Sequence, residues 1–220
     1  ANGPVAIRWR DARGQSHHTP CDMVGIGWHL RAETQLADLA GCAFSYNPQW
    51  SQWLPEADRM GRAGNGAYLA GDSFRILGAD GAEISGRLAA AACLQDLGLP
   101  VPDIAADLGH LEKLERFAAG LAKAFPWPAA HVAALRDETV LCRCEGITAG
   151  EVRRTVEWSG PEINRVKSLG RVGMGRCQGR FCHAGATEIV AAQHGLSPVE
   201  VGRLRGQAPV RPAPIGAWKA

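Results

Sequence analysis

The sequence lacks several features that would place it in a common class of protein. Its 220 residues contain no apolar run approaching about 18 residues, so no membrane-spanning helix is expected, and no signal peptide is visible. The net charge of +2 gives no general attraction to nucleic acid. Seven cysteines are an odd number for a disulfide framework, and 46% hydrophobic residues suffice for a core without one. We therefore expect a reducing compartment.

The glycine fingerprint GxGxxG of a dinucleotide-binding βαβ unit is also missing. Gly25 and Gly27 are followed by residues 28–30 (WHL), with no third glycine. No acid–base constellation is recognisable either, because His29, His110 and His194 are scattered along the chain and are expected to be structural or solvated. The catalytic residues therefore stay unassigned. Residues 1–4 (ANGP) lead directly into an apolar run, which favours the later part of a longer or processed polypeptide.

The first hundred residues predict a mixture of strands and helices. We expect strands at 5–10, 17–21, 22–27 (buried) and 67–70, helices at 32–40 and 81–97, and a long excursion or hairpin over 44–66. Glycines at 41 and 98 mark the two helix ends. Cys21, Cys42 and Cys93 stand in apolar contexts and are expected in the core.

The second half reads as helical. A linker at 100–103 leads to a helix with one apolar face through 111–121, which ends before the breaker at 125–128 (FPWP). Capping boxes at 148–151 and 197–200 predict helices that run to about Trp158 and Gly206. Two more helices are expected from Pro161 to Gly170 and from about 180 to 194, with a glycine-rich loop at 173–182 and a Pro-rich tail.

Four cysteines in this half carry the clearest chemistry. Cys142 and Cys144 form a C-x-C pair, and Cys177 and Cys182 form a C-x4-C pair. Both pairs lie in glycine-containing loops that lead into helix starts, where backbone N–H groups and the helix dipole favour a negative cluster. The pattern favours four thiolate ligands of a [2Fe-2S] cluster. His183 adjoins the second pair, but Rieske ligation needs two histidines, so we expect it to be a spectator.

Other uses of the same cysteines stay open. A structural zinc site is the main competitor, although zinc knuckles more often have the spacing C-x2–4-C. A redox-active dithiol formed by Cys177 and Cys182 is another, as in a pyridine-nucleotide disulfide oxidoreductase.

Charge is concentrated near these cysteines. From residue 142 to the C-terminus the chain has 12 Lys or Arg and 6 Asp or Glu, and the rest has 12 against 16. Arg143, Arg176 and Arg180 lie within the cysteine loops. Because an oxidised two-iron cluster with four thiolates is negative, we expect these arginines to offset its charge and tune its potential.

The four-cysteine region resembles the bacterioferritin-associated-ferredoxin-like (BFD-like) [2Fe-2S] domain. The resemblance covers roughly residues 139–214 and rests on 140–144 (VLCRC), 173–182 (GMGRCQGRFC), 197–200 (SPVE) and 211–214 (RPAP). All four ligand positions of the family are Cys here, which implies that Cys142, Cys144, Cys177 and Cys182 bind the cluster.

A second resemblance is to the last flavin-contacting segment of flavoproteins with two dinucleotide-binding domains. It rests on residues 67–72 (AYLAGD), 78–83 (GADGAE) and 86–90 (GRLAA). It implies that Asp72, after Gly71, binds the FAD ribityl chain and that the helix start at Gly81 and Ala82 faces the flavin. The adenine-binding half of such a site is absent from this sequence.

The order of these segments resembles the FAD/iron-sulfur subunit of bacterial amine and amino-acid dehydrogenases, which include opine oxidases, hydroxyproline dehydrogenases and hydrogen cyanide synthase. Residues 30–42 look nearest to the B subunit of the last. The resemblance implies a subunit of an oxidoreductase that acts on C–N bonds of an amino or imino acid. It implies a flavoprotein partner subunit in a hetero-oligomer and no nucleic acid. A respiratory-chain acceptor and a cytoplasmic location, either free or peripheral on the inner membrane face, are consistent with it.

The implied fold class is the α/β C-terminal part of a two-dinucleotide-binding-domain flavoprotein, followed by a small, mostly α-helical [2Fe-2S] domain. The expected divisions are the end of an NAD-type domain (1–22), the C-terminal half of an FAD-binding domain (23–100), a helical linker (101–138), the cluster domain (139–206) and the tail (207–220).

Overall fold

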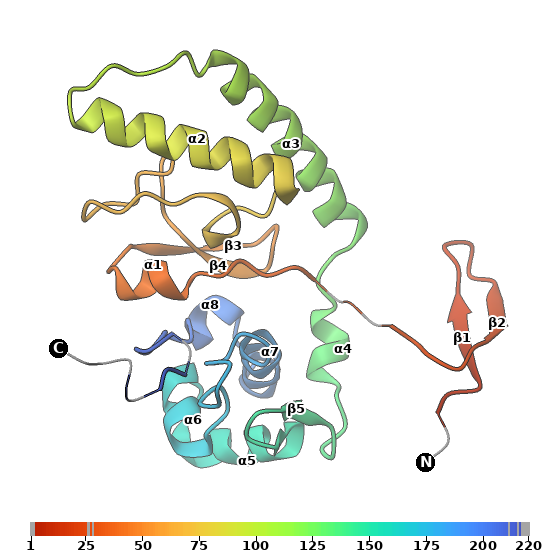
Figure 1. The fold of residues 1–220 in the computed structure, drawn as a ribbon. Coiled ribbons are helices and arrows are strands. Elements are labelled where there is room, and N and C mark those ends of the chain that lie inside the picture. The colour runs from red at the N-terminus through yellow and green to blue at the C-terminus, as the bar shows by residue number, and fades with distance from the viewer. Residues whose placement is uncertain (1–2, 26, 28, 211, 215, 217–220) are drawn as a thin grey trace.

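The computed structural model describes residues 3–25, 27, 29–210, 212–214 and 216 (Figure 1). Within these ranges every strand belongs to one of three two-stranded antiparallel sheets. The strands are β1 (Ala6–Arg10), β2 (Ser16–Pro20), β3 (Phe44–Asn47), β4 (Gln52–Pro55), β5 (Val140–Cys142) and β6 (Ile147–Thr148). The helices are α1 (Gln35–Leu39), α2 (Gly78–Asp96), α3 (Ala105–Ala124), α4 (Ala129–Ala133), α5 (Ala149–Ser159), α6 (Ile163–Gly170), α7 (His183–His194) and α8 (Pro198–Val201). None of the helices so described is both long and apolar enough to span a bilayer.

The chain begins with the expected hairpin, which stands to one side of the helices (Figure 1). Asp11 closes its turn by accepting hydrogen bonds from the backbone N–H groups of Arg13 and Gln15 at 2.9 and 2.8 Å. The prediction of a buried strand at 22–27 is wrong for the described residues, because they join no sheet and Met23 is 82% exposed. An apolar run forms a strand only where another strand can pair with it. Ile26 lies outside the described residues.

A small core follows, built from helix α1, the hairpin β3–β4 and the turns after it. It buries Ala37, Cys42, Ala63, Leu69 and Phe74. The expected helix at 32–40 forms only over α1, and the chain leaves it at Gly41 with φ +75°. The strand expected at 67–70 is reduced to one bridge between Tyr68 and Arg62, and a single 3₁₀ turn η1 (Gly71–Ser73) comes next.

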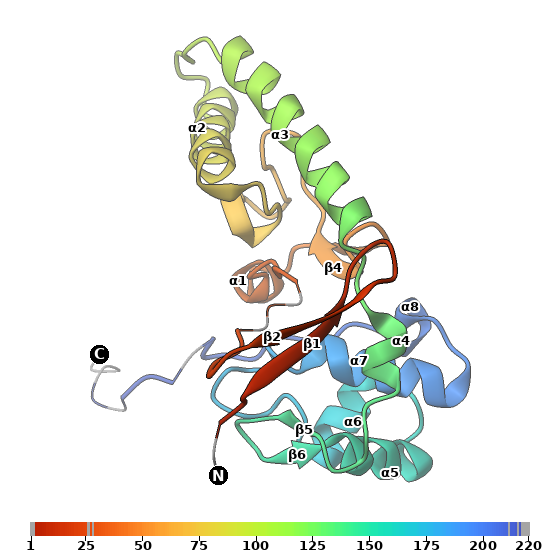
Figure 2. The ribbon, with the colours of Figure 1, turned by 90° about the vertical axis from the view of Figure 1, so that its right-hand side faces the viewer.

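Helices α2 and α3 pack against each other as a long pair (Figures 1 and 2). Ile84 and Leu88 from α2 meet Leu111 from α3, and each of the three is at most 2% exposed. Helix α2 begins at Gly78, three residues before the predicted start, and Gly98 ends it with φ +67°. The segment after it is irregular, as the linker prediction requires.

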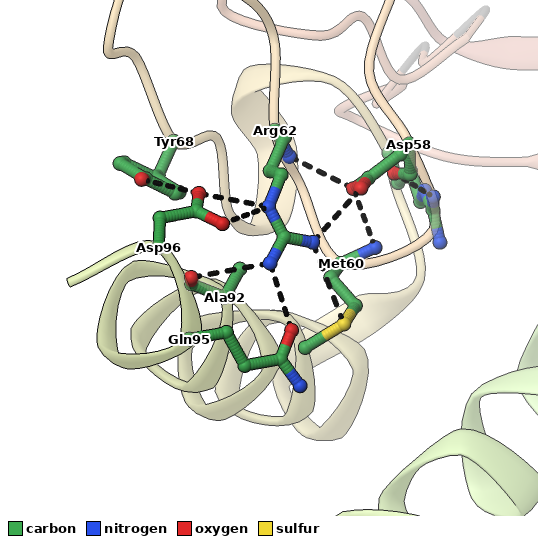
Figure 3. Close-up of polar contacts among 8 residues, drawn as sticks. Asp58, Met60, Arg62, Tyr68, Ala92, Gln95 and Asp96 are labelled. Carbon is green, nitrogen blue, oxygen red and sulfur yellow. Dashed lines mark hydrogen bonds and ion pairs between the residues drawn. The ribbon is translucent and has the colours of Figure 1, made fainter. Parts of the chain in front are cut away.

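Arg62 ties this helix pair to the turns before it (Figure 3). Its guanidinium donates to both carboxylate oxygens of Asp96 at 3.0 and 2.8 Å, to Asp58 at 3.1 Å and to the Gln95 side chain at 2.8 Å. Tyr68 donates its hydroxyl to Asp96 at 2.6 Å. These bonds raise the pKa of Arg62 above its ordinary value, so the cation is fixed at the end of α2.

The C-terminal part has its own core, centred on α7. Thirteen buried residues from 142 to 201 form it, including Val156 and Val190 at 0% exposure. Both predicted capping boxes are present, with Thr148 and Ser197 as N-caps. Three boundaries differ from the prediction. Helix α6 begins at Ile163 behind the N-cap Glu162 instead of at Pro161, α7 begins at His183, and α8 ends at Val201 because Gly202 takes φ +92°.

Side chains from residues 33–44 join the N-terminal core to this C-terminal part. Asp38 accepts a hydrogen bond from Arg203 at 2.7 Å and one from the backbone N–H of Gly206. The Arg203 guanidinium lies 3.9 Å from the centre of the Phe44 ring. Glu33 pairs with Arg180 in the cysteine loop. The loop is therefore braced from outside its own core.

Replacing Leu111 with alanine is expected to lower the free energy of unfolding by about 2–5 kcal/mol, because it leaves a cavity between α2 and α3. Leu121 is on the same helix and is 44% exposed, so Leu121→Ala is the matched control, with an expected loss below about 1 kcal/mol. Denaturant unfolding followed by circular dichroism measures both. Equal losses would contradict the core position of Leu111.

The Asp38 contacts predict an acid-sensitive joint. Burial raises the pKa of Asp38, but the bonds from Arg203 and Gly206 more than offset this and hold it below its usual range. The stabilisation is therefore present above the unfolded pKa of about 3.9 and is lost as the pH falls through the folded pKa. Asp38→Asn should be less stable than the wild type at pH 7 and should lose less stability on acidification. Parallel acid unfolding curves for the two proteins would contradict this.

Candidate metal centre

The four predicted ligand cysteines lie around one hollow of about 760 Å³. Cys142 is the last residue of β5, and Cys144 follows in the turn to β6. Cys177 is in the loop between α6 and α7, and Cys182 is the N-cap of α7. Two loops separated by 32 residues in the sequence thus present all four thiols to the same space.

Glycine geometry lets the two loops approach closely. A β-carbon at Gly175 would lie 2.2 Å from the β-carbon of Cys144. Gly146 has φ +72°, and it closes the tight turn after the first cysteine pair. Gly179 has φ +83°, and it turns the chain between Cys177 and Cys182. A side chain at Gly175 would push the two cysteine loops apart, and one at Gly179 would overlap Leu204.

The thiols lie in two neighbouring pairs. Cys182 is next to Cys142, and both are buried at 2% and 1% exposure. Burial raises the pKa of the Cys182 thiol, and the neighbouring Cys142 adds to the rise. Cys144 is next to Cys177 and is exposed. Hydrogen bonds from Cys177, together with the nearby Arg176, lower the pKa of Cys144. One pair is therefore dry and the other faces solvent.

The donor set fits a [2Fe-2S] cluster. In a two-iron cluster each iron takes two thiolates, and the two observed pairs supply this. His183 does not line the hollow, and its Nδ1 lies 3.0 Å from the Gly179 carbonyl oxygen.

The arginines of the loops divide into two groups. Arg143 and Arg176 line the hollow, where they would offset the charge of four thiolates. Arg180 points elsewhere. It pairs with Glu33 and donates to the backbone carbonyls of Cys177 and Val210 at 3.1 and 2.8 Å. Arg180 therefore braces the loop, and its expected effect on the cluster potential stays a prediction.

One contact between the loops was not expected from the sequence. Arg171, just after α6, donates to Glu145 beside the first cysteine pair, with distances of 2.9 and 2.8 Å. Arg171 has φ +64°, a left-handed conformation that is uncommon for a residue with a side chain. A Lys-Ser-Leu-Gly-Arg helix end carries no sequence signal for that conformation, so only the structure reveals the contact.

The predicted flavin contacts are partly brought together. Gly71 has φ +58°, and a β-carbon there would come within 3.0 Å of the Ala82 β-carbon, so η1 packs on the first turns of α2. Asp72 is exposed, and its backbone carbonyl accepts from the Glu33 N–H at 2.8 Å. Gly81 is buried against Leu77, and the exposed start of α2 is at residues 78–80. The FAD-contact assignment stays a prediction.

Comparison with known proteins first identifies the class of the cysteine region. Residues 140–192 match the family described as the BFD-like [2Fe-2S] binding domain. The match spans both cysteine pairs and helices α5 and α6, and most of α7. This agrees with a cluster site formed by the two loops.

The whole chain has more particular relatives. It is 40% identical to the A subunit of opine oxidase from Rhizobium meliloti over 94% of this chain and 40% of that protein. It is 36% identical to the corresponding opine oxidase protein of Agrobacterium tumefaciens (92% and 42%), and 35% identical to hydrogen cyanide synthase subunit HcnB of Pseudomonas aeruginosa (98% and 47%). The chain thus spans less than half the length of these relatives.

The fold has a counterpart among solved structures. The crystal structure of L-proline dehydrogenase from P. horikoshii superposes with a TM-score of 0.67 at 17% identity, over 97% of this chain and 42% of the other. At that identity the likeness shows the fold alone. The strands in the described part of the chain form only two-stranded antiparallel sheets, so the parallel sheet of a dinucleotide-binding domain is not seen among them.

Gly175→Ala is expected to separate the cysteine loops. The added methyl would overlap the Cys144 side chain, so we expect a loss of about 1–3 kcal/mol and a fall in bound iron per chain. Gly120→Ala in α3 meets nothing within 4 Å and is the control, expected to be neutral or stabilising by up to about 1 kcal/mol. Iron assays and thermal unfolding test both, and full iron retention in Gly175→Ala would contradict the predicted contact.

Proposed function

We propose that this chain is the electron-transfer FAD/[2Fe-2S] part of a multi-subunit, flavin-dependent amino-acid dehydrogenase. The main observation behind this proposal is that four thiols lie in two pairs around one hollow: Cys142, Cys144, Cys177 and Cys182. The relatives named as opine oxidase and hydrogen cyanide synthase subunits support the amino-acid chemistry. Their names as subunits support a hetero-oligomer.

In this proposal the four thiolates hold the cluster, which when bound supplies one-electron transfer. The buried pair, Cys142 and Cys182, excludes water from one side. In the other pair Cys144 is exposed and Cys177 is half-buried, which leaves that side accessible to an electron donor or acceptor. Arg143 and Arg176 lower the cost of gathering four negative sulfurs, and so raise the reduction potential of the site.

The FAD part of the proposal rests on the segment around η1 and α2. Gly71 packs against Ala82, and residues 78–80 at the N-terminus of α2 are exposed. Asp72 is exposed beside them. In this proposal the glycines that bind the adenine half of FAD lie outside this sequence. The relatives are more than twice as long as the matched region, which leaves room for them.

The divisions of the chain follow the same proposal. The proposed divisions are the end of an NAD-type domain (1–22), the C-terminal half of an FAD-binding domain (23–100), a helical linker (101–138), the cluster domain (139–206) and the tail (207–220). Support comes from the cores: residues 142–201 form one cluster, while 37–74 and the α2–α3 pair form two others. The amino or imino acid is oxidised in a partner subunit, and electrons leave through the exposed thiol pair.

Cys177→Ser is the direct test. The wild-type chain should contain about two irons and two sulfides, with visible absorbance that bleaches and an EPR signal that appears on dithionite reduction. The variant should lose most of both signals. Cys93→Ser, on helix α2 and away from the hollow, is the matched control and should keep them.

Two results would contradict the proposal. One zinc per chain with no colour, in protein purified without oxygen, would make the hollow a structural zinc site. An unchanged spectrum in Cys177→Ser would remove this residue from the ligand set.

A further inference from the structure

Helix α3 carries an exposed row of large apolar side chains. Phe117 and Leu121 are four residues apart on it, and Phe125 follows at its C-cap, so the three lie along one face. They are 67%, 44% and 67% exposed. A neighbouring face of the helix is buried through Leu111 and Ala118. Extended apolar surface of this kind marks a site of contact with another molecule.

A groove of about 350 Å³ follows the C-terminal half of this row. It is lined mainly by apolar side chains of α3 and of earlier segments: Leu30, Trp50, Ile76, Ala118, Leu121 and Phe125. Ala118 and Ala122 are 5% and 6% exposed, and their short side chains leave the space above them open. His29 Nε2 lies 2.9 Å from the Phe125 carbonyl oxygen, which ties the two sides of the groove together. Such a groove accepts the apolar side chains of a helix laid along it.

The carboxylates of α3 are all used within the chain. Each of them pairs with an arginine from an earlier segment: Glu112 with Arg59 at 2.7 Å, Glu115 with Arg75 at 3.0 Å and Asp107 with Arg87 at 2.7 Å. These pairs join α3 to helix α2 and to the turns before it. They also leave the outer surface of α3 without a free negative charge.

The cations of α3 are not used in this way. Lys113, Arg116 and Lys123 are exposed, and no carboxylate of the described residues lies within salt-bridge distance of them. Their spacing of three and seven residues places them on one face. Four residues advance about 40° around a helix, so Lys113, Phe117 and Leu121 follow one another and the basic row borders the apolar row.

We propose that α3 and this groove bind an amphipathic helix with acidic side chains along one edge, which belongs to another subunit. Its apolar side chains would enter the groove and cover Phe117 and Leu121, and its carboxylates would pair with Arg116 and Lys123. The four-residue spacing of the apolar row matches the spacing of side chains on a partner helix. The surface is away from the thiol hollow, so binding does not depend on the cluster. Only the assignment of the helix to another subunit rests on the proposed hetero-oligomer.

Fluorescence anisotropy of the full chain with two labelled helical peptides tests the kind of partner. Both peptides carry leucines at spacings of three and four residues. One has glutamates along its edges, and the other has lysines at the same positions. We expect the glutamate peptide to bind about tenfold more tightly at low salt, and the difference to shrink as salt is added, because the charged pairs are exposed. No binding of the glutamate peptide, or equal binding of the two, would overturn the proposal.

Reversal of two charges tests the location. The double variant Arg116→Glu with Lys123→Glu should bind the glutamate peptide about tenfold more weakly than the wild type and should prefer the lysine peptide. The matched control is Arg154→Glu with Arg165→Glu. These exposed residues are on α5 and α6, at the opposite end of the molecule from α3 (Figures 1 and 2), so the control should keep the wild-type preference. An unchanged preference in the first variant would overturn the site.

Leu121→Ala tests the apolar part of the surface. It removes a side chain that the peptide would cover, so the affinity for the glutamate peptide should fall about fivefold. Leu97→Ala is the matched control, because Leu97 is 66% exposed at the end of α2 and does not line the groove, and it should leave the affinity unchanged. Equal affinities in the two variants would overturn the role of the groove. Circular dichroism shows whether each variant is folded, and iron content reports separately on the proposed cluster.

Two other occupants of the surface give different results. Dimerisation of the wild-type chain in analytical ultracentrifugation, abolished by Leu121→Ala, would show that a second copy covers the row. Binding to phosphatidylglycerol vesicles, abolished by Arg116→Glu with Lys123→Glu, would show that it lies on an anionic membrane. Either result would overturn the assignment to a partner helix.

Discussion

Burial of helix α7 holds the cysteine site in place. The helix contacts α4, α5, α6 and α8, and Ile189 and Val190 are at most 1% exposed. Its N-cap is Cys182, so the position of one thiol is fixed by the packing of a whole core. Because the interior of a protein is densely packed, a shift of α7 would move the thiol and disturb many contacts together. The hollow is therefore preformed by the hydrophobic core.

Cys142 reaches the same hollow from the end of β5, and Cys144 and Cys177 reach it from turns. Their positions depend on glycines that accept positive φ or close contact, and on the Arg171–Glu145 pair between the loops. The loop of Cys177 is further braced from the N-terminal core through Glu33 and Gln35. Because the loop is held from both sides, one face of the thiol site can be shielded from solvent while the other face stays open to it. Residues 29–35 meet the loop there and line a second cavity of about 320 Å³.

Local signals in the sequence predicted the C-terminal part well. Capping boxes at Thr148 and Ser197 depend on neighbouring residues only, and both are formed. Cys142, Cys144, Cys177 and Cys182 were chosen from spacing, and they share one hollow. The strand expected near Met23 failed because a strand requires a partner that no local pattern reveals. The pairing of Arg180 with Glu33 could not be predicted for a similar reason, since Glu33 is 147 residues away in the sequence. Long-range pairing decides such features.

Exposed apolar side chains occur in both halves of the chain. Buried residues from 142 to 201 form the C-terminal core. Val5, Met23 and Leu30 in the N-terminal half are 74–82% exposed, and Phe181 in the cysteine loop is 88% exposed. Exposed apolar surface, where it is extensive, marks a place that another surface covers. The cysteine loop is also braced by Glu33 and Gln35 from the N-terminal half, so the geometry of the thiol hollow depends on both halves.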